Sequence, residues 1–396
     1  MKFVTQSARW ATLGFALLLG GSASAAVVTN NDTSSTFSTL NAAIAAASAG
    51  HTLTVDGTDG NPLEEFVTVD KTLTIQGTNN AKLTGPASGG PDALITVEAD
   101  AVVIDNLALE LNLPVATGAI KVHQLSDNSI NTVEISNNTI TRTGTGGDTA
   151  GITQFGYCCG YEESVGIVVD SRPMFTNRDP ITATITNNTI GTASDPLSFA
   201  GIWFEKAAGT VTGNTVYSES FAWISRFSPS GIDVLIDGNT FAGWGDERNR
   251  GALVELGDPG ANSRVIFENN TVEALAGLSP FNSFIHRRNI QLKNIYSEKQ
   301  LYVENNNIIA RNTGLAITNA RSAVVVGNTI TAAEPDTVLL EVNNKIYSSG
   351  TPFANIPVNI PTILANTLDA DGQTSVTAGI FRKHSVANTA SSPIAP

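Results

Sequence analysis

A short motif built around asparagine recurs along most of this 396-residue chain. In its clearest copy, VIFENNTV at 265–272, apolar and polar residues alternate, break at Asn-Asn and resume with a β-branched residue. Because Asn and Gly tolerate the positive φ of a tight corner, the motif predicts a strand, a corner and another strand. The aligned asparagines are Asn106, Asn138, Asn188, Asn214, Asn239, Asn270, Asn306, Asn328 and Asn366.

The spacing of this repeat predicts the architecture. Successive aligned asparagines lie between 22 residues apart (306 to 328) and 50 residues apart (138 to 188). A period centred in this range is typical of a solenoid, and loops of different length explain its variation. Stacked corner asparagines can also hydrogen-bond along the solenoid axis. We therefore expect one elongated all-β solenoid domain of about ten coils over residues 26–385.

The two ends of the chain differ from the repeat. Residues 1–25 combine Lys2 and Arg9 with an apolar run and a small-residue Ala-Ser-Ala ending, which predicts a secretion signal. That run is too short to span a bilayer, and no other stretch is apolar enough. We therefore expect a secreted protein without a transmembrane segment, in the periplasm, at the cell surface or outside the cell. Residues 386–396 are small and polar and predict a disordered tail.

The formal net charge of −14 at pH 7 bears on partners. An acidic chain of this kind is not expected to bind nucleic acid or an anionic membrane through bulk charge. It is compatible with calcium, and 56–61 and 369–372 resemble pieces of calcium loops because Asp and Asn alternate with Gly. Both lack the bidentate Glu of a complete loop. Ca²⁺ is therefore the one cofactor that the sequence suggests, with no metal ligands assigned.

Residues 36–50 predict a short helix with Leu40, Ile44 and Ala47 on one face and Gly50 after its end. Such a helix would cap the open end of the stack. Strand patterns follow at 51–55, 65–69 and 73–77. Together with the Asn motifs, they resemble the pectate-lyase-like superfamily of right-handed parallel β-helix proteins, over about residues 36–385.

This resemblance implies a single-stranded right-handed parallel β-helix, and it names no activity. The superfamily includes polysaccharide lyases, polygalacturonases, uronate epimerases, phage tailspikes and bacterial surface proteins. The chain lacks the Asn-Thr-Asp, Asp-Asp, Gly-His-Gly and Arg-Ile-Lys motifs of polygalacturonases. It also lacks the Trp- and Arg-bearing motifs of plant-type pectate lyases. The chemistry must therefore be sought in which side chains the coils bring together.

A second recurrent strand lies between the Asn motifs. Its copies are 118–122, 166–170, 201–205, 222–226, 251–255, 283–287, 314–318 and 338–341. If they stack in register, neighbours lie about 4.8 Å apart and the fifth position forms an outward column of charge. That column would contain Asp170, Glu205, Arg226, Glu255 and Arg287. Two interpretations of the column stay open: opposite charges on adjacent strands that only stabilise the sheet surface, or a groove for an anionic polysaccharide.

The groove hypothesis assigns roles to particular residues. β-Elimination on a uronate needs a cation that acidifies the proton beside the carboxylate and a base that removes it. Arg226, Arg287 and His286 are the catalytic candidates. The substrate-binding candidates are Asp170, Trp203, Glu205, Trp244, Glu255 and Arg288.

The longest interval between motifs, 141–164, predicts a loop over the same face. It contains the adjacent Cys158 and Cys159, which could form a strained disulfide, pair between chains or remain free. Two functions stay open for the chain. One is an exported carbohydrate-active protein that acts on or binds an anionic polysaccharide or cell-surface glycan, as a lyase or an epimerase. The other is a non-catalytic surface or matrix protein that adheres or self-associates.

Overall fold

The computed structural model describes residues 27–88, 92–113, 115–123, 130–144, 164–171, 180–226, 231–243, 252–257, 263–276, 288–293, 300–318, 322–346, 362–373 and 375–386. The expected signal peptide and the two cysteines lie outside these residues, as does the expected tail after Val386. Those three assignments stay predictions.

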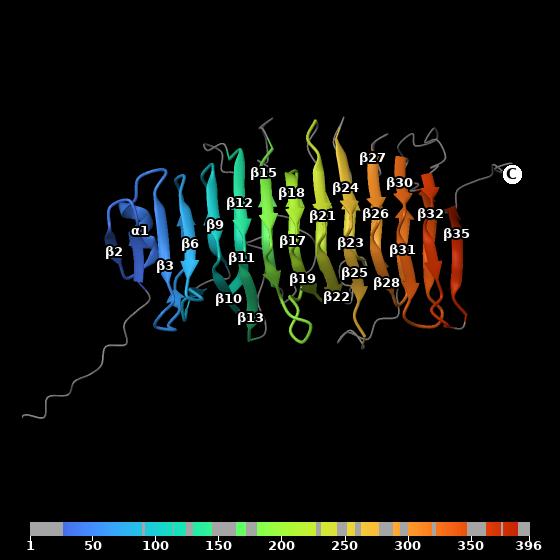
Figure 1. Ribbon diagram of the computed structural model, residues 1–396, viewed down its shortest axis with the longest axis horizontal. Coiled ribbons are helices and arrows are strands. Elements are labelled where there is room, and N and C mark those ends of the chain that lie inside the picture. The colour runs from blue at the N-terminus through green and yellow to red at the C-terminus, as the bar shows by residue number, and fades with distance from the viewer. Residues whose placement is uncertain are drawn as a thin grey trace, which may run out of the picture.

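Three long sheets form the molecule, and strands stack side by side from one end to the other (Figure 1). Each coil contributes one strand to each sheet, and neighbouring coils pair in parallel. The first sheet runs β2 (Ser35–Phe37), β1 (Val27–Asn30), β3 (Thr52–Asp56), β6 (Thr74–Thr78), β9 (Val102–Asp105), β12 (Thr132–Ser136), β15 (Thr182–Thr186), β18 (Ala208–Thr212), β21 (Val234–Asp237), β24 (Arg264–Glu268), β27 (Gln300–Glu304), β30 (Ser322–Val326) and β33 (Thr362–Leu364).

The other two sheets have eleven strands each among the described residues. The second comprises β4 (Leu63–Glu64), β7 (Lys82–Thr84), β10 (Ala108–Asn112), β13 (Thr139–Thr143), β16 (Thr189–Ile190), β19 (Thr215–Ser218), β22 (Thr240–Gly243), β25 (Thr271–Ala274), β28 (Asn307–Ala310), β31 (Thr329–Ala332) and β34 (Thr367–Asp369). The third comprises β5 (Val67–Val69), β8 (Asp92–Val97), β11 (Ala116–His123), β14 (Val165–Asp170), β17 (Ala200–Glu205), β20 (Phe221–Arg226), β23 (Ala252–Gly257), β26 (Arg288–Lys293), β29 (Thr313–Thr318), β32 (Val338–Ile346) and β35 (Thr377–Val386).

The predicted parallel β-helix is thus confirmed. Its core runs along the inside of the stack and is made of alternate residues of every strand. In the 265–272 motif, Val265, Phe267 and Val272 are fully buried, whereas Ile266 and Glu268 face outward. The alternation of apolar and polar residues therefore determines which side of each strand enters the core.

The repeated asparagines form a ladder along the corner between the first two sheets. From Asn188 onward, each side chain accepts hydrogen bonds from the backbone N–H and Nδ2 of the asparagine one coil earlier, at 2.8–3.2 Å. Its own Nδ2 also donates to a backbone carbonyl of the preceding coil. The ladder comprises Asn138, Asn188, Asn214, Asn239, Asn270, Asn306, Asn328 and Asn366.

Asn106 was expected in this ladder, but it occupies the preceding corner position. Its φ is +56°, and the next residue, Leu107, donates its N–H to Asn138 Oδ1. In most other coils that left-handed corner position is also filled by Asn or Gly, because neither pays the full steric cost of positive φ. Ala365 is an exception, with φ +54°. In each Asn-Asn pair, the first residue therefore turns the chain and the second forms the hydrogen bonds between coils.

The N-terminal end is capped, as predicted, by a shorter helix than expected. Helix α1 spans Leu40–Ala46, and the hydroxyl of its N-cap Thr39 accepts the N–H of Ala42. The Glu65 carboxylate also accepts the first helical N–H groups, 2.6 Å from Leu40 N. Residues 36 and 37, expected in the helix, belong instead to β2, which pairs antiparallel with β1. The cap is therefore a hairpin plus a helix.

Candidate functional site on the third sheet

Charged and ionisable residues occupy one outward column of the third sheet. Strand pairing aligns His123 of β11 with Asp170 of β14, Asp170 with Glu205 of β17, and Glu205 with Arg226 of β20. We call these four residues the titratable column. Adjacent members lie on neighbouring parallel strands, about 4.8 Å apart along the stack. The predicted alignment of Asp170, Glu205 and Arg226 is confirmed.

Glu255 does not continue this column, which corrects the sequence-based alignment. Strand β23 pairs Glu255 with Ile224 of β20, and β26 then places Gln291 beside it. Glu255 therefore lies in the neighbouring outward column, the one that contains Lys121 and Trp203. A shift of two residues keeps every side chain on the same face of the strand, so the alternation of the sequence could not distinguish the two registers.

His123 was missed by the sequence analysis. The recurrent strand pattern aligns 118–122 with 166–170 and therefore Gly118 with Gly166, whereas the structure pairs Gly118 with Val165. This difference of one residue brings His123, rather than Val122, beside Asp170. Matching the inward apolar residues would have given the right register, because Ile120 pairs with Ile167 in the core.

The side chains of His123, Asp170 and Glu205 in the titratable column are buried. His123 is 8% exposed, and Asp170 and Glu205 are 3% and 1% exposed. Burial lowers the pKa of His123 below its ordinary value of 6.5, and the positive charge of Lys121 lowers it further. The imidazole is therefore neutral at pH 7, the state in which a histidine can accept a proton.

An apolar cluster borders the titratable column on the same outer face. Trp203 is 1% exposed, and its indole packs edge to face against Phe199 with ring centroids 5.7 Å apart. Its Nε1–H donates to Glu205 Oε2 at 3.0 Å. The cluster comprises Val165, Val168, Phe199, Ala200, Trp203, Phe221 and Ile224. Trp203 is a substrate-binding candidate of the sequence, but in this conformation its ring faces are covered by protein.

Four predicted site residues remain, and the structure describes only the backbone of one of them, Arg288. Trp244, His286 and Arg287 lie outside the described residues, and their roles stay predictions. The strand expected at 283–287 also lies outside the described residues. The described strand between β23 and β29 is β26, which begins at Arg288. Residue 288 aligns with Ala252 and Thr313 at the start of these strands, and Lys293 aligns with Gly257 and Thr318 at their end.

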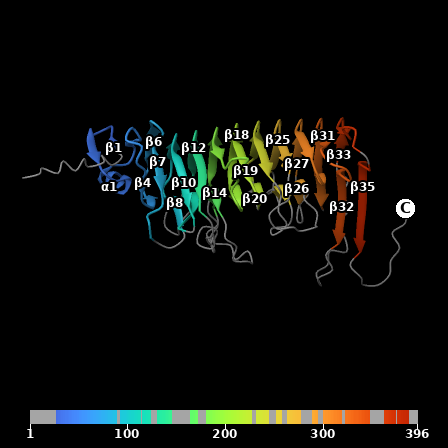
Figure 2. The same cartoon turned by 90° about the horizontal axis from the view of Figure 1, so that it is seen from below.

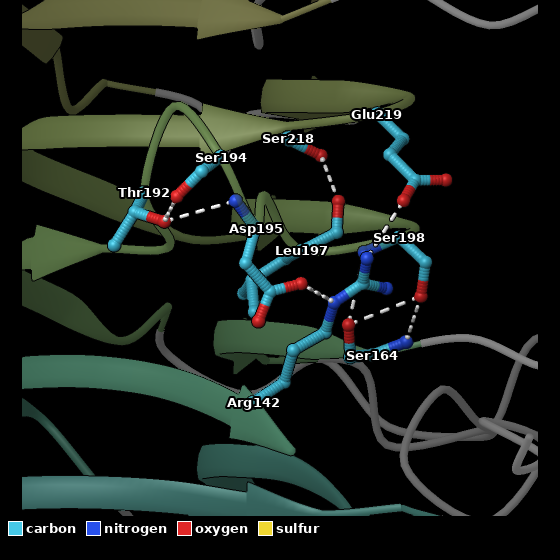
Figure 3. A network of polar contacts seen from close by, with 9 residues as sticks. All are labelled: Arg142, Ser164, Thr192, Ser194, Asp195, Leu197, Ser198, Ser218 and Glu219. Atoms are coloured by element: carbon cyan, nitrogen blue, oxygen red, sulfur yellow. Dashed lines mark hydrogen bonds and ion pairs between the residues drawn. The ribbon is translucent and has the colours of Figure 1, made fainter. Parts of the chain in front are cut away.

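Arg142 joins three coils at the edge of this region (Figure 3). Its guanidinium lies between two carboxylates, with Nε 2.9 Å from Asp195 Oδ1 and a terminal nitrogen 2.8 Å from Glu219 Oε1. Beside it, Ser164 and Ser198 exchange backbone-to-hydroxyl hydrogen bonds of 2.8 and 2.9 Å. Because Arg142 belongs to β13 and Glu219 follows β19, this network ties the chain before the 145–163 interval to later coils.

The two calcium-loop fragments form local turns. Asp56 Oδ1 accepts from the N–H and hydroxyl of Thr58 and from Asn79 Nδ2, and these bonds, that of Asn79 foremost, lower the pKa of the Asp56 carboxyl. Asp369 Oδ1 likewise accepts the N–H of Asp371. Within the described part of the chain, no group of three His, Cys, Asp or Glu residues is placed to hold a metal ion. Calcium binding therefore stays a prediction.

No helix in the described ranges is long and apolar enough to cross a membrane. No protein-family model matches the chain, and neither does any curated protein. Among solved structures, three of the periplasmic alginate epimerase AlgG are similar, two of them variants. Their TM-scores are 0.41, 0.39 and 0.37, at 11%, 10% and 10% identity, and 84–85% of this chain and 85% of theirs are covered. The fold assignment rests on the strand pairing above, and no residue role is taken from these structures.

Proposed function

We propose that this protein is carbohydrate-active and removes the proton beside the carboxylate of a uronate in an anionic polysaccharide. The observation that carries the proposal is the titratable column, in which a neutral buried histidine stands in line with two carboxylates and an arginine. Buried, perturbed ionisable groups gathered in one place are typical of catalytic sites, although ion-pair networks can also produce them.

In this proposal His123 is the base. It takes the proton from the carbon next to the carboxylate, and the electron pair left on that carbon is delocalised into the carboxylate. Lys121, next to it on β11, and Arg226, at the end of the column, are the candidate cations that stabilise this charge. In an epimerase a proton then returns to the opposite face of the sugar. In a lyase the neighbouring C–O bond breaks, and its oxygen takes a proton.

Because the side chains of His123, Asp170 and Glu205 are buried, the outer face of the third sheet must open before a polysaccharide can react there. A polysaccharide can reach His123 only if binding exposes this face, because the imidazole is 8% exposed in the structure. Openings of this kind are common in enzymes that exclude water from the reacting groups. We therefore expect substrate to increase amide hydrogen exchange in β11 and β14 during its binding step.

A second function is favoured by the apolar cluster. The outer face around Trp203 is packed like a core, as it would be in a non-catalytic surface or matrix protein. In that case, the titratable column would be an ion-pair network that stabilises the sheet surface.

Proton exchange distinguishes the two functions. Residues 26–396 would be incubated in D₂O with alginate, polygalacturonate, chondroitin and heparin, with and without Ca²⁺. NMR would follow deuterium entering the uronate, and absorbance would follow unsaturated uronate. An epimerase gives the first signal and a lyase the second. His123→Gln should lower either rate by about 10²-fold or more, since general base catalysis contributes about that much.

Glu134→Gln is the matched control. Glu134 is an exposed acid of β12 on the first sheet, and its replacement should leave the rate unchanged. Neither signal on any polymer, or a His123→Gln rate equal to that of the unmodified protein, would contradict the proposal. Retained polymer binding without either signal would support the non-catalytic function.

A further inference from the structure

Two elements close the N-terminal end of the stack. Strand β1 pairs antiparallel with β3 along its whole length and covers the outer edge of that strand. Helix α1 lies beside β1 at this end, over the end of the core, and its Leu40, Ala43 and Ile44 are buried (Figure 2). We call β1 and α1 together the N-terminal cap. Because an unpaired strand edge can pair with another chain, the cap protects the edge of β3 as well as the core.

A histidine ties both parts of this cap to the first coil. His51, the residue before β3, places its Nδ1 3.0 Å from Nδ2 of Asn30, which ends β1. The same Nδ1 lies 3.3 Å from the backbone nitrogen of Ser48, shortly after the end of α1. The backbone carbonyl of His51 accepts the N–H of Thr74 in the next coil at 3.1 Å. The imidazole therefore connects the end of β1, the end of α1 and the stack.

The direction of these hydrogen bonds is fixed by the groups around them. Asn30 is 1% exposed, and its Oδ1 accepts the N–H of Asp32 at 3.1 Å. Reversing the amide would place Nδ2 against that N–H, so Nδ2 is the atom that points at the imidazole. The backbone N–H of Ser48 can only donate. Nδ1 of His51 therefore faces two donors and must accept from both, which requires an imidazole with its single proton on Nε2.

A proton on Nδ1 would turn this acceptor into a third donor. Both hydrogen bonds would then be lost, and the buried Nδ2 of Asn30 would keep no acceptor among the described residues. Histidine is the side chain that gains a proton in the range of about pH 5 to 8. Acid therefore weakens the cap at this nitrogen.

The charged groups of the neighbouring elements have other partners. The Asp32 carboxylate, on the turn after β1, accepts a backbone N–H of β3 at 2.7 Å. The Lys71 ammonium, before β6, donates to the carbonyl that follows α1 at 3.2 Å and lies 4.0 Å from Asp70. The Glu65 carboxylate accepts at the opposite end of α1. In the part of the chain that the structure describes, no carboxylate forms an ion pair with His51, so its charged form gains no partner in place of the two bonds that it loses.

We propose that the N-terminal cap is a pH-sensitive closure, held shut while Nδ1 of His51 accepts from Asn30 and Ser48 and released when that nitrogen takes a proton. The open cap accepts this proton freely and the closed cap does not, so the stability of the cap falls as the pH falls. Opening frees β1 and α1 and exposes the edge of β3, while later coils stay folded because each coil contacts only its neighbours. This proposal goes beyond the proposed function and does not depend on it.

Amide hydrogen exchange of purified residues 26–396 tests the closure. Protection factors, which correct for the intrinsic effect of pH, would be measured for β1 and α1 at about pH 7.5 and about pH 5, with β18 and β21 as the internal reference. Relative to that reference, protection of the cap should fall by about tenfold or more in acid, because a buried amide donor without an acceptor shifts an equilibrium by at least about that much. Nitrogen NMR should show the Nε2–H form of His51 at the higher pH.

Three variants make the test specific. His51→Asn places Oδ1 where Nδ1 stands, accepts the same two N–H groups and does not titrate, so the cap should stay protected in acid. Asn30→Asp offers the charged imidazole a carboxylate, so protection should not fall in acid, and it replaces the first variant if that one does not fold. Thr54→Val is the matched control, because it removes the 3.0 Å bond from Asn31 to Thr54 in the same cap and leaves the titrating contact in place.

Three results would overturn the proposal. The first is equal relative protection of the cap at both pH values in the unmodified protein. The second is an acid-induced loss that persists in His51→Asn or disappears in Thr54→Val. The third is a proton on Nδ1 of His51 at about pH 7.5.

Discussion

Replacing one asparagine in the middle of the ladder should lower the free energy of unfolding by more than the small size of its side chain suggests. Asn239 is fully buried between coils. Its Oδ1 accepts from the N–H and Nδ2 of Asn214, both at 2.9 Å. Its Nδ2 donates to Asn270 Oδ1 at 3.0 Å, to the Val211 carbonyl at 2.9 Å and to the Asp237 carbonyl at 3.1 Å. We expect Asn239→Ala to remove all five bonds at once.

The magnitude follows from which groups lose their partners. The buried backbone N–H of Asn214 loses its acceptor, and leaving such a donor unsatisfied costs about 1–3 kcal/mol. Each of the other lost bonds contributes about 0.5–1.5 kcal/mol, and the alanine leaves a gap that water cannot easily fill. Taking the lower part of these ranges, we expect Asn239→Ala to lower the free energy of unfolding by about 3–5 kcal/mol.

Urea unfolding followed by circular dichroism would measure this loss. Because a solenoid can unfold in segments, amide exchange at residue 214 should be followed as well. Two variants serve as controls. Asn366→Ala, at the partly exposed end of the ladder, should cost about 1 kcal/mol because water can replace the lost partner. Thr240 faces outward next to Asn239, and Thr240→Ala should lower the free energy of unfolding by less than about 1 kcal/mol, that is by less than Asn366→Ala. A loss for Asn239→Ala no larger than that for Thr240→Ala would refute the reasoning.

Three further predictions concern other positions. Ala365→Asn should raise the free energy of unfolding by about 0.5–1 kcal/mol, seen as a higher thermal midpoint, because Ala365 turns a left-handed corner at φ +54°. Arg142→Met should lower it by about 1–3 kcal/mol in urea, since the guanidinium between Asp195 and Glu219 is mostly buried; an unchanged midpoint would contradict this. The pKa of His123 is lower in the folded protein than in the unfolded chain, so on acidification the unfolded chain binds this proton at the higher pH. The free energy of unfolding should therefore fall as the pH drops through 6.5, and His123→Gln should make that fall smaller.

The local pattern of residues determined the repeating part of the structure. The alternation in each motif decides which side chains enter the core, and this held for Val265 and Phe267. The Asn-Asn and Gly-Asn pairs indicated both a corner and a ladder, because only a few residue types tolerate positive φ. The repeat therefore predicted a solenoid, the family resemblance implied a parallel β-helix, and residues 36–50 indicated a cap before the first coil.

Only the tertiary structure decided how the outward columns are composed. The side-chain period of a strand is two, so a shift of two residues moved Glu255 from the column of Arg226 to that of Trp203 without altering the pattern. A shift of one residue brought His123 beside Asp170. The burial of Trp203 and the exposure of Leu364 likewise depend on what lies over each side chain. Inward positions follow from the sequence because the core selects apolar residues, whereas outward neighbours depend on the register that strand pairing sets between coils.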